Sequence, residues 1–169
     1  MTKTKPKESE FSADDVLNLE EIPRSASLLS IATQRAARKL KSDLHKLLMA
    51  HGDLGLADFR LLRHLSKADV ATQKELALGA AMEQAQVSRS LASLEKRQMV
   101  QSCVYPNDRR VRLFSLLPKG RAAFESVRPK VAEHNASLSS HLTEEEEKQT
   151  LRVLGEIVRR SAQSINTNT

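Results

Sequence analysis

A basic cluster and a slim polar segment are the parts of this sequence whose side chains could do chemistry. Residues 81–121 hold eight Lys or Arg against three Asp or Glu, a net charge of +5 out of +6 for the 169-residue chain. A focused excess of positive charge is typical of a protein that binds a polyanion. A solvated basic face has the same composition, so the charge alone leaves both interpretations open.

Residues 84–97 are predicted to form a helix with one buried and one exposed side. Val87, Leu91 and Leu94 recur at helical spacing and mark the buried side. The other side is small and polar, with almost no acid in its first two turns. Such a face fits the major groove of DNA, and it is equally compatible with an ordinary surface helix.

A hairpin with a basic turn is predicted to follow this helix. Residues 99–105 and 111–116 have the composition of strands, and residues 106–110 that of a turn. Arg109, Arg110 and Arg112 lie at or near that turn. Their mutual repulsion favours an anionic partner, such as a phosphate backbone, unless Asp108 offsets it.

Three helices are predicted on the N-terminal side of this polar helix and basic hairpin, and they must position both. Residues 24–50 are predicted as one long amphipathic helix, and residues 57–67 as the next. A short helix over residues 73–79 is expected to begin at a capping box, in which Thr72 and Glu75 each satisfy the backbone amide of the other.

Two more helices are predicted after the hairpin. Pro118 suits the first helical position, and this helix is expected to run to about residue 140 with a kink or break at Pro129. The last helix is expected to begin at Thr143, which forms a second capping box with Glu146.

The composition also bears on the class of protein. A single Cys excludes an internal disulfide and suits a reducing compartment. The polar N-terminus has no apolar segment of a secretory signal, and no apolar run is long enough to span a membrane, so a cytoplasmic protein is expected. Phosphate-loop, dinucleotide and nucleophile-elbow motifs are missing, and the five His are scattered. We therefore expect no enzyme activity, no cofactor and no metal site.

The chain resembles the MarR family of bacterial winged-helix regulators over residues 28–162. The likeness rests on Glu75-Leu76-Ala77, on Val87-Ser88-Arg89 followed by Leu94-Glu95-Lys96, and on Asp108-Arg109-Arg110 followed by Leu116 and Lys119-Gly120. It implies a mainly α fold with a small β-wing, in which terminal helices form a homodimer. It also implies binding to a palindromic operator in double-stranded DNA, and repression that a small phenolic or aromatic anion, or oxidation, often relieves.

The resemblance sets an expected domain organisation. Residues 1–23 form a flexible tail, residues 24–165 a single domain, and residues 166–169 a frayed end. Within the domain, the parts at 24–55 and 118–165 serve dimerisation and the part at 56–117 binds DNA.

Expected DNA contacts follow from the same placement. In the major groove, Gln84 and Gln86 would read adenine, Arg89 would read guanine, and Ala85 would meet a thymine methyl group. Gln73 and Ser88 would hold phosphates, helped by the positive helix end. The wing would place Arg109 or Arg110 in the minor groove, with Asp108 orienting an arginine.

Three residues depart from the family pattern. Gln98 stands where the family usually has Gly, so a left-handed conformation at a non-Gly residue is expected, at a cost of about 1 kcal/mol. Leu117 stands where a Thr usually caps the following helix, and Glu83 replaces a better capping Asp or Asn.

Several alternatives stay open from the sequence. A winged-helix module for protein partners would keep the fold without needing Arg89 together with the wing arginines. Cys103 suggests a thiol redox switch, although a lone Cys in a strand is more often a small buried hydrophobe. Phe59 and His64 could border an effector pocket, with packing the commoner role of Phe59.

Overall fold

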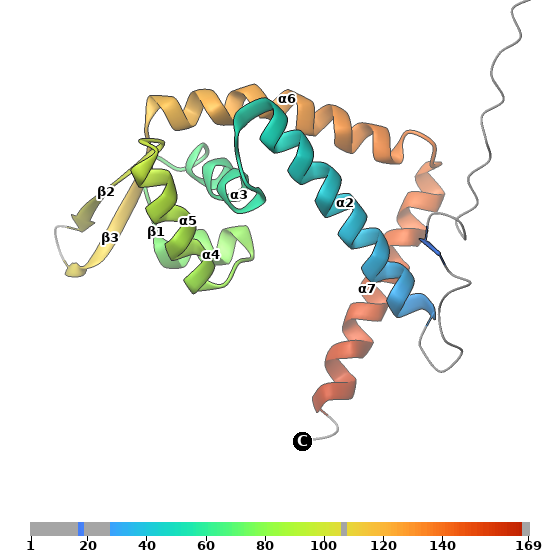
Figure 1. Ribbon diagram of the computed structural model, residues 1–169. Helices are drawn as coiled ribbons and strands as arrows, with labels where there is room; N and C mark the ends of the chain where they lie inside the picture. The colour runs from blue at the N-terminus through green and yellow to red at the C-terminus, as the bar shows by residue number, and fades with distance from the viewer. Residues whose placement is uncertain (1–16, 19–27, 106–107, 167–169) are drawn as a thin grey trace, which may run out of the picture.

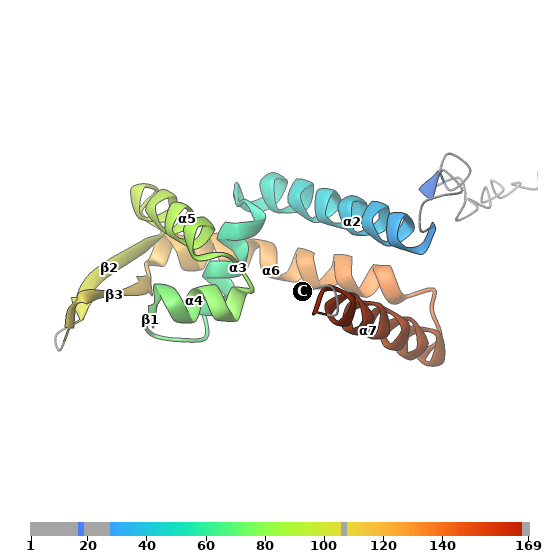
Figure 2. The same ribbon diagram turned by 90° about the horizontal axis from the view of Figure 1, so that it is seen from below.

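The computed structural model describes residues 17–18, 28–105 and 108–166 (Figure 1). Its elements from residue 28 on are α2 (Leu28–Gly52), α3 (Leu56–Leu65), β1 (Ala71–Thr72), α4 (Gln73–Ala80), α5 (Gln84–Lys96), β2 (Val100–Tyr105), β3 (Asp108–Leu116), α6 (Pro118–Ser139) and α7 (Glu144–Asn166). The compact end with α3, α4, α5 and the sheet lies opposite the end that carries α7 and the start of α2 (Figures 1 and 2). No described helix is long and apolar enough to cross a membrane.

A three-stranded antiparallel sheet follows the order β1-β3-β2. The hairpin pairs Val100 with Leu116 and runs out to Tyr105 opposite Asp108. The strand β3 therefore begins at Asp108, three residues earlier than expected, and the predicted turn at 106–110 is too long. The two-residue strand β1, which the sequence did not predict, pairs Ala71 with Phe114. With helices before and after it, this small sheet confirms the expected winged-helix fold.

One apolar cluster holds the compact end together. Its fully buried members come from every helix of that end, from α2 and from α6, and include Leu48, Leu54, Leu61, Leu62, Leu65, Leu76, Val87, Leu91, Leu94, Val100 and Val127. Val87, Leu91 and Leu94 are the residues predicted for the buried side of α5. Burial of a Leu or Val side chain stabilises a fold by about 1.5–3 kcal/mol, so this cluster fixes which face of α5 points outward.

Both predicted capping boxes are confirmed. The Thr72 hydroxyl accepts the Glu75 amide at 3.2 Å, and the Glu75 carboxylate accepts the Thr72 amide at 2.8 Å. Thr143 and Glu146 form the same pair of bonds at the start of α7, at 3.3 and 2.8 Å.

Pro129 does not break α6, so of the two predicted outcomes, a kink or a break, the break is wrong. The helix runs without interruption from Pro118 to Ser139 with Pro129 inside it. Proline removes one backbone hydrogen bond and costs a helix interior about 3 kcal/mol. Phe124, Val127 and Val131, which flank Pro129, are buried, and their packing offsets that cost.

The departures from the family pattern have visible consequences. Gln98 has a φ of 58°, which confirms the predicted left-handed conformation. Glu83 and Leu117 begin their helices without a side-chain capping bond. Ala81, which follows α4, has a φ of 50° and is a second left-handed non-Gly residue of the winged helix.

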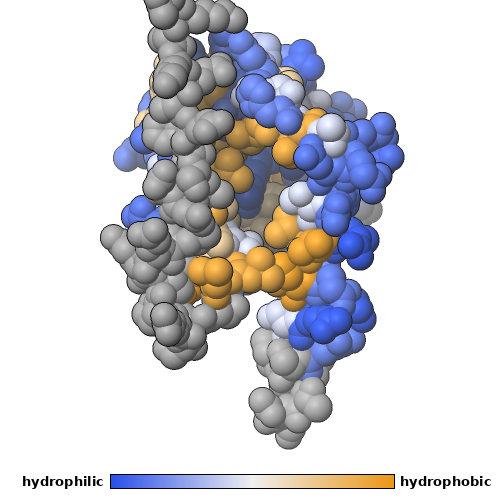
Figure 3. All heavy atoms as spheres, turned by 90° about the vertical axis from the view of Figure 1, so that its right-hand side faces the viewer, coloured by the Kyte–Doolittle hydropathy of each residue, from blue (hydrophilic) through white to orange (hydrophobic). Residues whose placement is uncertain are grey.

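The last helix, α7, exposes an apolar stripe. Leu151, Leu154 and Val158 are 62%, 39% and 70% exposed. Exposed Leu28 and Leu29 lie at the start of α2. Figure 3 shows apolar groups gathered on this face around a hollow. Monomeric proteins rarely expose contiguous apolar patches of this kind, so the stripe is a candidate interaction surface.

Candidate nucleic-acid interface and cavity

The exposed face of α5 carries every residue that the sequence predicted to read DNA bases. Gln84, Ala85, Gln86 and Arg89 are exposed, and so is Ser88, which was expected to hold a phosphate. The first turn of α5 contains no acid. Because the apolar residues of α5 are buried, these polar side chains face outward together.

The N-terminal ends of α4 and α5 lie beside one another. The Gln73 side-chain amide donates to the Gln84 carbonyl at 3.4 Å, a long hydrogen bond. A hollow of about 440 Å³ lies here and is lined by Thr72, Gln73, Lys74, Gln84, Val111 and Arg112. The backbone amides at the start of α4 face this hollow together with two cations, Lys74 and Arg112. Backbone amides and cations together suit an anionic group.

Hydrogen bonds to the Thr72 backbone amide and then to its hydroxyl hold the pKa of Glu75 below its usual value. This carboxylate is therefore ionised at neutral pH, and it is committed to the cap. Glu75 thus has a structural role at the start of α4.

The wing, the hairpin of β2 and β3, contacts α5 through Glu95. Its carboxylate accepts the Ser102 hydroxyl at 2.5 Å and the Arg112 guanidinium at 3.0 Å. Arg112 also lies over the Phe114 ring, 5.4 Å from the ring centre. The sequence grouped Arg112 with Arg109 and Arg110 as arginines that repel one another. This is wrong for Arg112, because its charge is paired with Glu95 within the protein. The side chains of Arg109 and Arg110 lie outside the described residues; Asp108 is exposed at the start of β3.

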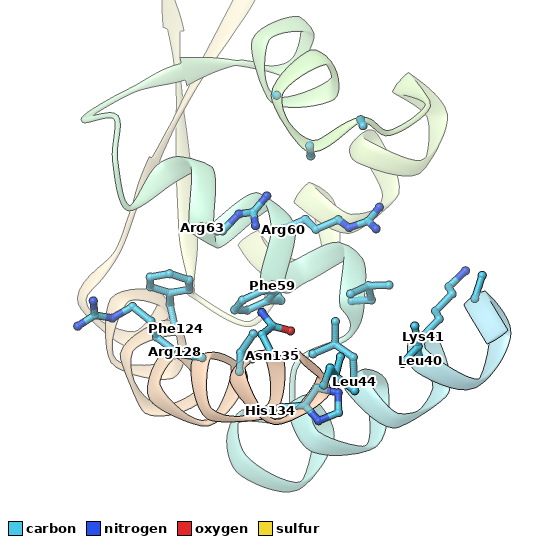
Figure 4. A pocket seen from close by; sticks show the side chains of 18 of the residues that line it. Leu40, Lys41, Leu44, Phe59, Arg60, Arg63, Phe124, Arg128, His134 and Asn135 are labelled. Carbon is cyan, nitrogen blue, oxygen red and sulfur yellow. The ribbon is translucent and has the colours of Figure 1, made fainter. Parts of the chain in front are cut away.

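A second feature is a cavity of about 930 Å³ between α2, α3, the end of α4, and α6 (Figure 4). Phe59 and Phe124 line it and stack with ring centres 5.7 Å apart. The cations along its wall are Lys41, Arg60, Arg63, Lys67 and Arg128, and no Asp or Glu belongs to the lining. An apolar floor with a cationic rim suits a small aromatic anion.

The other candidate residues lie elsewhere. His64 is not among the lining residues; its ring packs on Gly79, where a Cβ would come within 2.3 Å of it. Cys103 is exposed in β2, so the expectation of a buried thiol is wrong. Among the described residues, no three His, Cys, Asp or Glu gather as metal ligands.

The sequence reasoning missed the cations of the cavity. Arg60 and Arg63 are three residues apart and share one face of α3, and Lys67 lies in the turn that follows this helix. The sequence spacing of these residues could have indicated a basic surface on this helix. Their convergence with Lys41 and Arg128 was not, because it depends on how α2, α3 and α6 pack.

Comparison with known proteins places the likeness to a family in the compact end. Residues 54–111, about a third of the chain, match the model of the MarR family. The matched segment is similar to this family. It covers α3, α4, α5, β2 and the start of β3, and so includes the outward face of α5. Among curated proteins, none matches the sequence.

Solved structures of MarR regulators share the fold over most of this chain. A crystal structure titled as a MarR family transcription regulator is 20% identical, with a TM-score of 0.72 over 82% of this chain and 91% of that one. MepR of S. aureus, solved in complex with DNA, is 21% identical, with a TM-score of 0.69 over 78% and 96%. BpsR of Bordetella bronchiseptica is 22% identical, with a TM-score of 0.67 over 78% and 99%; its title describes regulation of DNA binding by 6-hydroxynicotinic acid. At these identities the likeness establishes the fold.

Proposed function

We propose that this chain is a homodimeric, sequence-specific regulator of transcription that binds a palindromic operator in double-stranded DNA. It acts in the cytoplasm as a repressor, and a small aromatic or phenolic anion relieves the repression. The observation that carries the proposal is the exposed, acid-free first turn of α5, which lies beside a basic wing in a MarR-type winged helix.

Base reading is assigned to the exposed residues of α5. Gln84 and Gln86 have the paired donor and acceptor that match adenine, and Arg89 has the fork that matches guanine. Ala85 leaves room for a thymine methyl group. MepR of S. aureus and MOSR of M. tuberculosis, which are similar to this chain, are solved with DNA, and this supports DNA as the partner. In this proposal α5 is the recognition helix.

The remaining predicted contacts position the duplex. Gln73 and Ser88 are assigned to phosphates: Gln73 is the first residue of α4, at its positive end, and Ser88 is exposed on the second turn of α5. Arg109 and Arg110 are assigned to the minor groove, with Asp108 as the residue that orients one of them. This division gives affinity to the backbone contacts and specificity to α5.

The dimer is assigned to the helices outside the winged helix, the parts at 24–55 and 118–165. Leu151, Leu154 and Val158 recur at three- and four-residue spacing along α7, and all three are exposed. The described part of the chain has no buried residue on α7. A second copy that covers this stripe would remove it from water and would place two recognition helices about 34–36 Å apart.

The ligand is assigned to the cavity between α2, α3 and α6. Its stacked Phe pair suits an aromatic ring, and Arg60, Arg63 and Arg128 suit a carboxylate or phenolate. The regulation of BpsR by an aromatic acid supports this ligand class.

Selection from a pool of random duplexes tests the proposal. We expect the purified protein to enrich a palindrome, with a steep decrease in affinity as salt rises. Arg89→Ala should weaken binding to this operator by about 1–3 kcal/mol and relax one base position. Arg38→Ala removes the same charge from an exposed site on α2 and serves as the control.

Two results would count against this function. Recovery of no preferred duplex would favour a module that binds proteins. Equal losses for Arg89→Ala on operator and random DNA would mean that Arg89 contacts only the backbone. Selected palindromes that release the protein when 6-hydroxynicotinic acid is added would identify the effector class as well.

A further inference from the structure

The last turn of α5 is in contact with two other parts of the molecule. Glu95 binds Ser102 and Arg112 of the wing, as described above. Arg97, two residues later, points to the opposite side and binds the junction between α2 and α3. The end of the recognition helix is therefore linked to the wing and to the helices of the basic cavity.

Arg97 holds the junction from two sides. Its Nη1 lies 3.1 Å from Asp58 Oδ2 on α3, and its Nη2 lies 3.2 Å from Asp53 Oδ2 just after α2. The same Nη2 also donates to the Asp53 carbonyl. A guanidinium with several fixed donors can hold both partners at once, whereas a lysine ammonium is a single point charge.

Asp58 has two tasks in this junction. Its Oδ2 accepts the Gly55 amide at 3.3 Å at the start of α3 and also receives Arg97. The next two residues, Phe59 and Arg60, line the cavity. A displacement of the first turn of α3 therefore moves the cavity wall and the carboxylate that holds Arg97 together.

The energetics of this pair favour a positioning role. The Asp58 side chain is only 14% exposed, and burial raises its pKa even though Gly55 and Arg97 both act to lower it. Burial therefore costs the charged carboxylate more than its partners return. Partly buried pairs of this kind contribute little net stability, because desolvation offsets the attraction. What the pair supplies is a fixed geometry between α3 and α5.

We propose that Asp58 and Arg97 are positioning residues that convert occupancy of the basic cavity into a change in the direction of α5. The inference rests on the proposed function. A ligand against Phe59 and Arg60 displaces the first turn of α3, and Asp58 carries this displacement to Arg97. Because Glu95 lies in the same turn of α5, the wing moves with the recognition helix.

A covalent filling of the cavity tests this coupling without knowledge of the natural ligand. In a Cys103→Ser background, Ala132→Cys places one thiol on the cavity wall, and benzyl methanethiosulfonate attaches an aromatic group to it. Operator affinity is measured with and without the adduct, first in this parent and then with Asp58→Asn or Arg97→Lys added. Lys130→Gln, which removes an exposed ion pair on α6, is the matched control.

We expect the adduct to weaken operator binding at least about 5-fold in the parent and in Lys130→Gln. In Asp58→Asn and in Arg97→Lys the same adduct should weaken it less than about 2-fold. The ratio within each variant is the readout, because a purely structural role would change affinity or melting temperature and leave that ratio as in the parent. Circular dichroism and thermal unfolding verify that each variant is folded.

Two outcomes overturn the coupling. Equal ratios in all variants would mean that the signal bypasses Asp58 and Arg97, and an adduct without effect on the parent would mean that the cavity does not act on α5. In both cases an unmodified parent that prefers its operator over a scrambled duplex leaves the proposed DNA binding intact. A parent that shows no such preference refutes the proposed function, and the coupling with it.

Discussion

Gly120→Ala should destabilise the protein, because the first turn of α6 lies against the backbone that joins α5 to β2. A Cβ at Gly120 would lie 2.1 Å from the Met99 carbonyl oxygen and 2.9 Å from its carbon. The same carbonyl accepts the Leu117 amide at 3.0 Å. The methyl group therefore forces the start of α6 away from Met99 and breaks this hydrogen bond.

The size of the effect follows from three contributions. Overpacking costs about 1–3 kcal/mol, and the lost hydrogen bond adds about 1 kcal/mol. The better helix propensity of Ala returns about 1 kcal/mol. We expect the free energy of unfolding to fall by about 2 kcal/mol, which lowers the melting temperature by about 4–8 °C for a chain of this length.

Urea denaturation at a fixed protein concentration measures this difference, and Gly155→Ala is the matched control. Gly155 also lies within a helix, and a Cβ there meets nothing within 4 Å in the described structure. Gly155→Ala should therefore stabilise by about 0.5–1 kcal/mol. A Gly120→Ala variant as stable as the wild type would refute the reasoning. Because Gly155 shares its face of α7 with Leu151 and Val158, which the proposed dimer covers, both Gly variants are compared in the monomeric background Leu154→Glu with Val158→Glu.

Three further predictions concern the turn, the cap and the exposed stripe. Gln98→Gly should raise the free energy of unfolding by about 0.5–1 kcal/mol in urea denaturation, because Gly relieves the φ of 58°; an unchanged midpoint would contradict this. Because the pKa of Glu75 is lowered in the folded state, its contribution is present at neutral pH and is lost as pH falls below about 4.5. Glu75→Gln should therefore lose less stability than the wild type on acidification, and parallel pH profiles would argue against it. Leu154→Glu with Val158→Glu should yield a folded monomer in analytical ultracentrifugation, and a persistent dimer would move the interface elsewhere.

Local chemistry made much of the fold predictable from the sequence. The capping boxes depend on residues three apart, and the buried side of α5 depends on periodicity, so both were recognisable without tertiary information. The left-handed conformation of Gln98 was also predictable, because the family resemblance places Gly there. The winged helix follows from these local patterns in their order along the chain.

Other features depend on distant residues and could not be predicted. The strand β1 has only two residues, and Ala71 is a strand residue because Phe114 pairs with it. Pro129 favours a helix end locally, and the packing of its neighbours on α6 overrides that preference. Arg112 looks like a wing cation in the sequence, and only the fold brings Glu95 within 3.0 Å of it.

The uneven attachment of α5 has a consequence for how this protein could change its target. Glu95 and Arg97 attach the C-terminal turn through ion pairs, whereas the side-chain bond described at the first turn is the long one from Gln73 to the Gln84 carbonyl, with Val87 buried just beyond it. A small rotation of α5 about its C-terminal turn therefore displaces Gln84, at the opposite end of the helix, more than any other residue of α5. New operator preferences can arise by substitution of the exposed residues in the first turns of α5, while the C-terminal turn and the core residues beneath it stay unchanged.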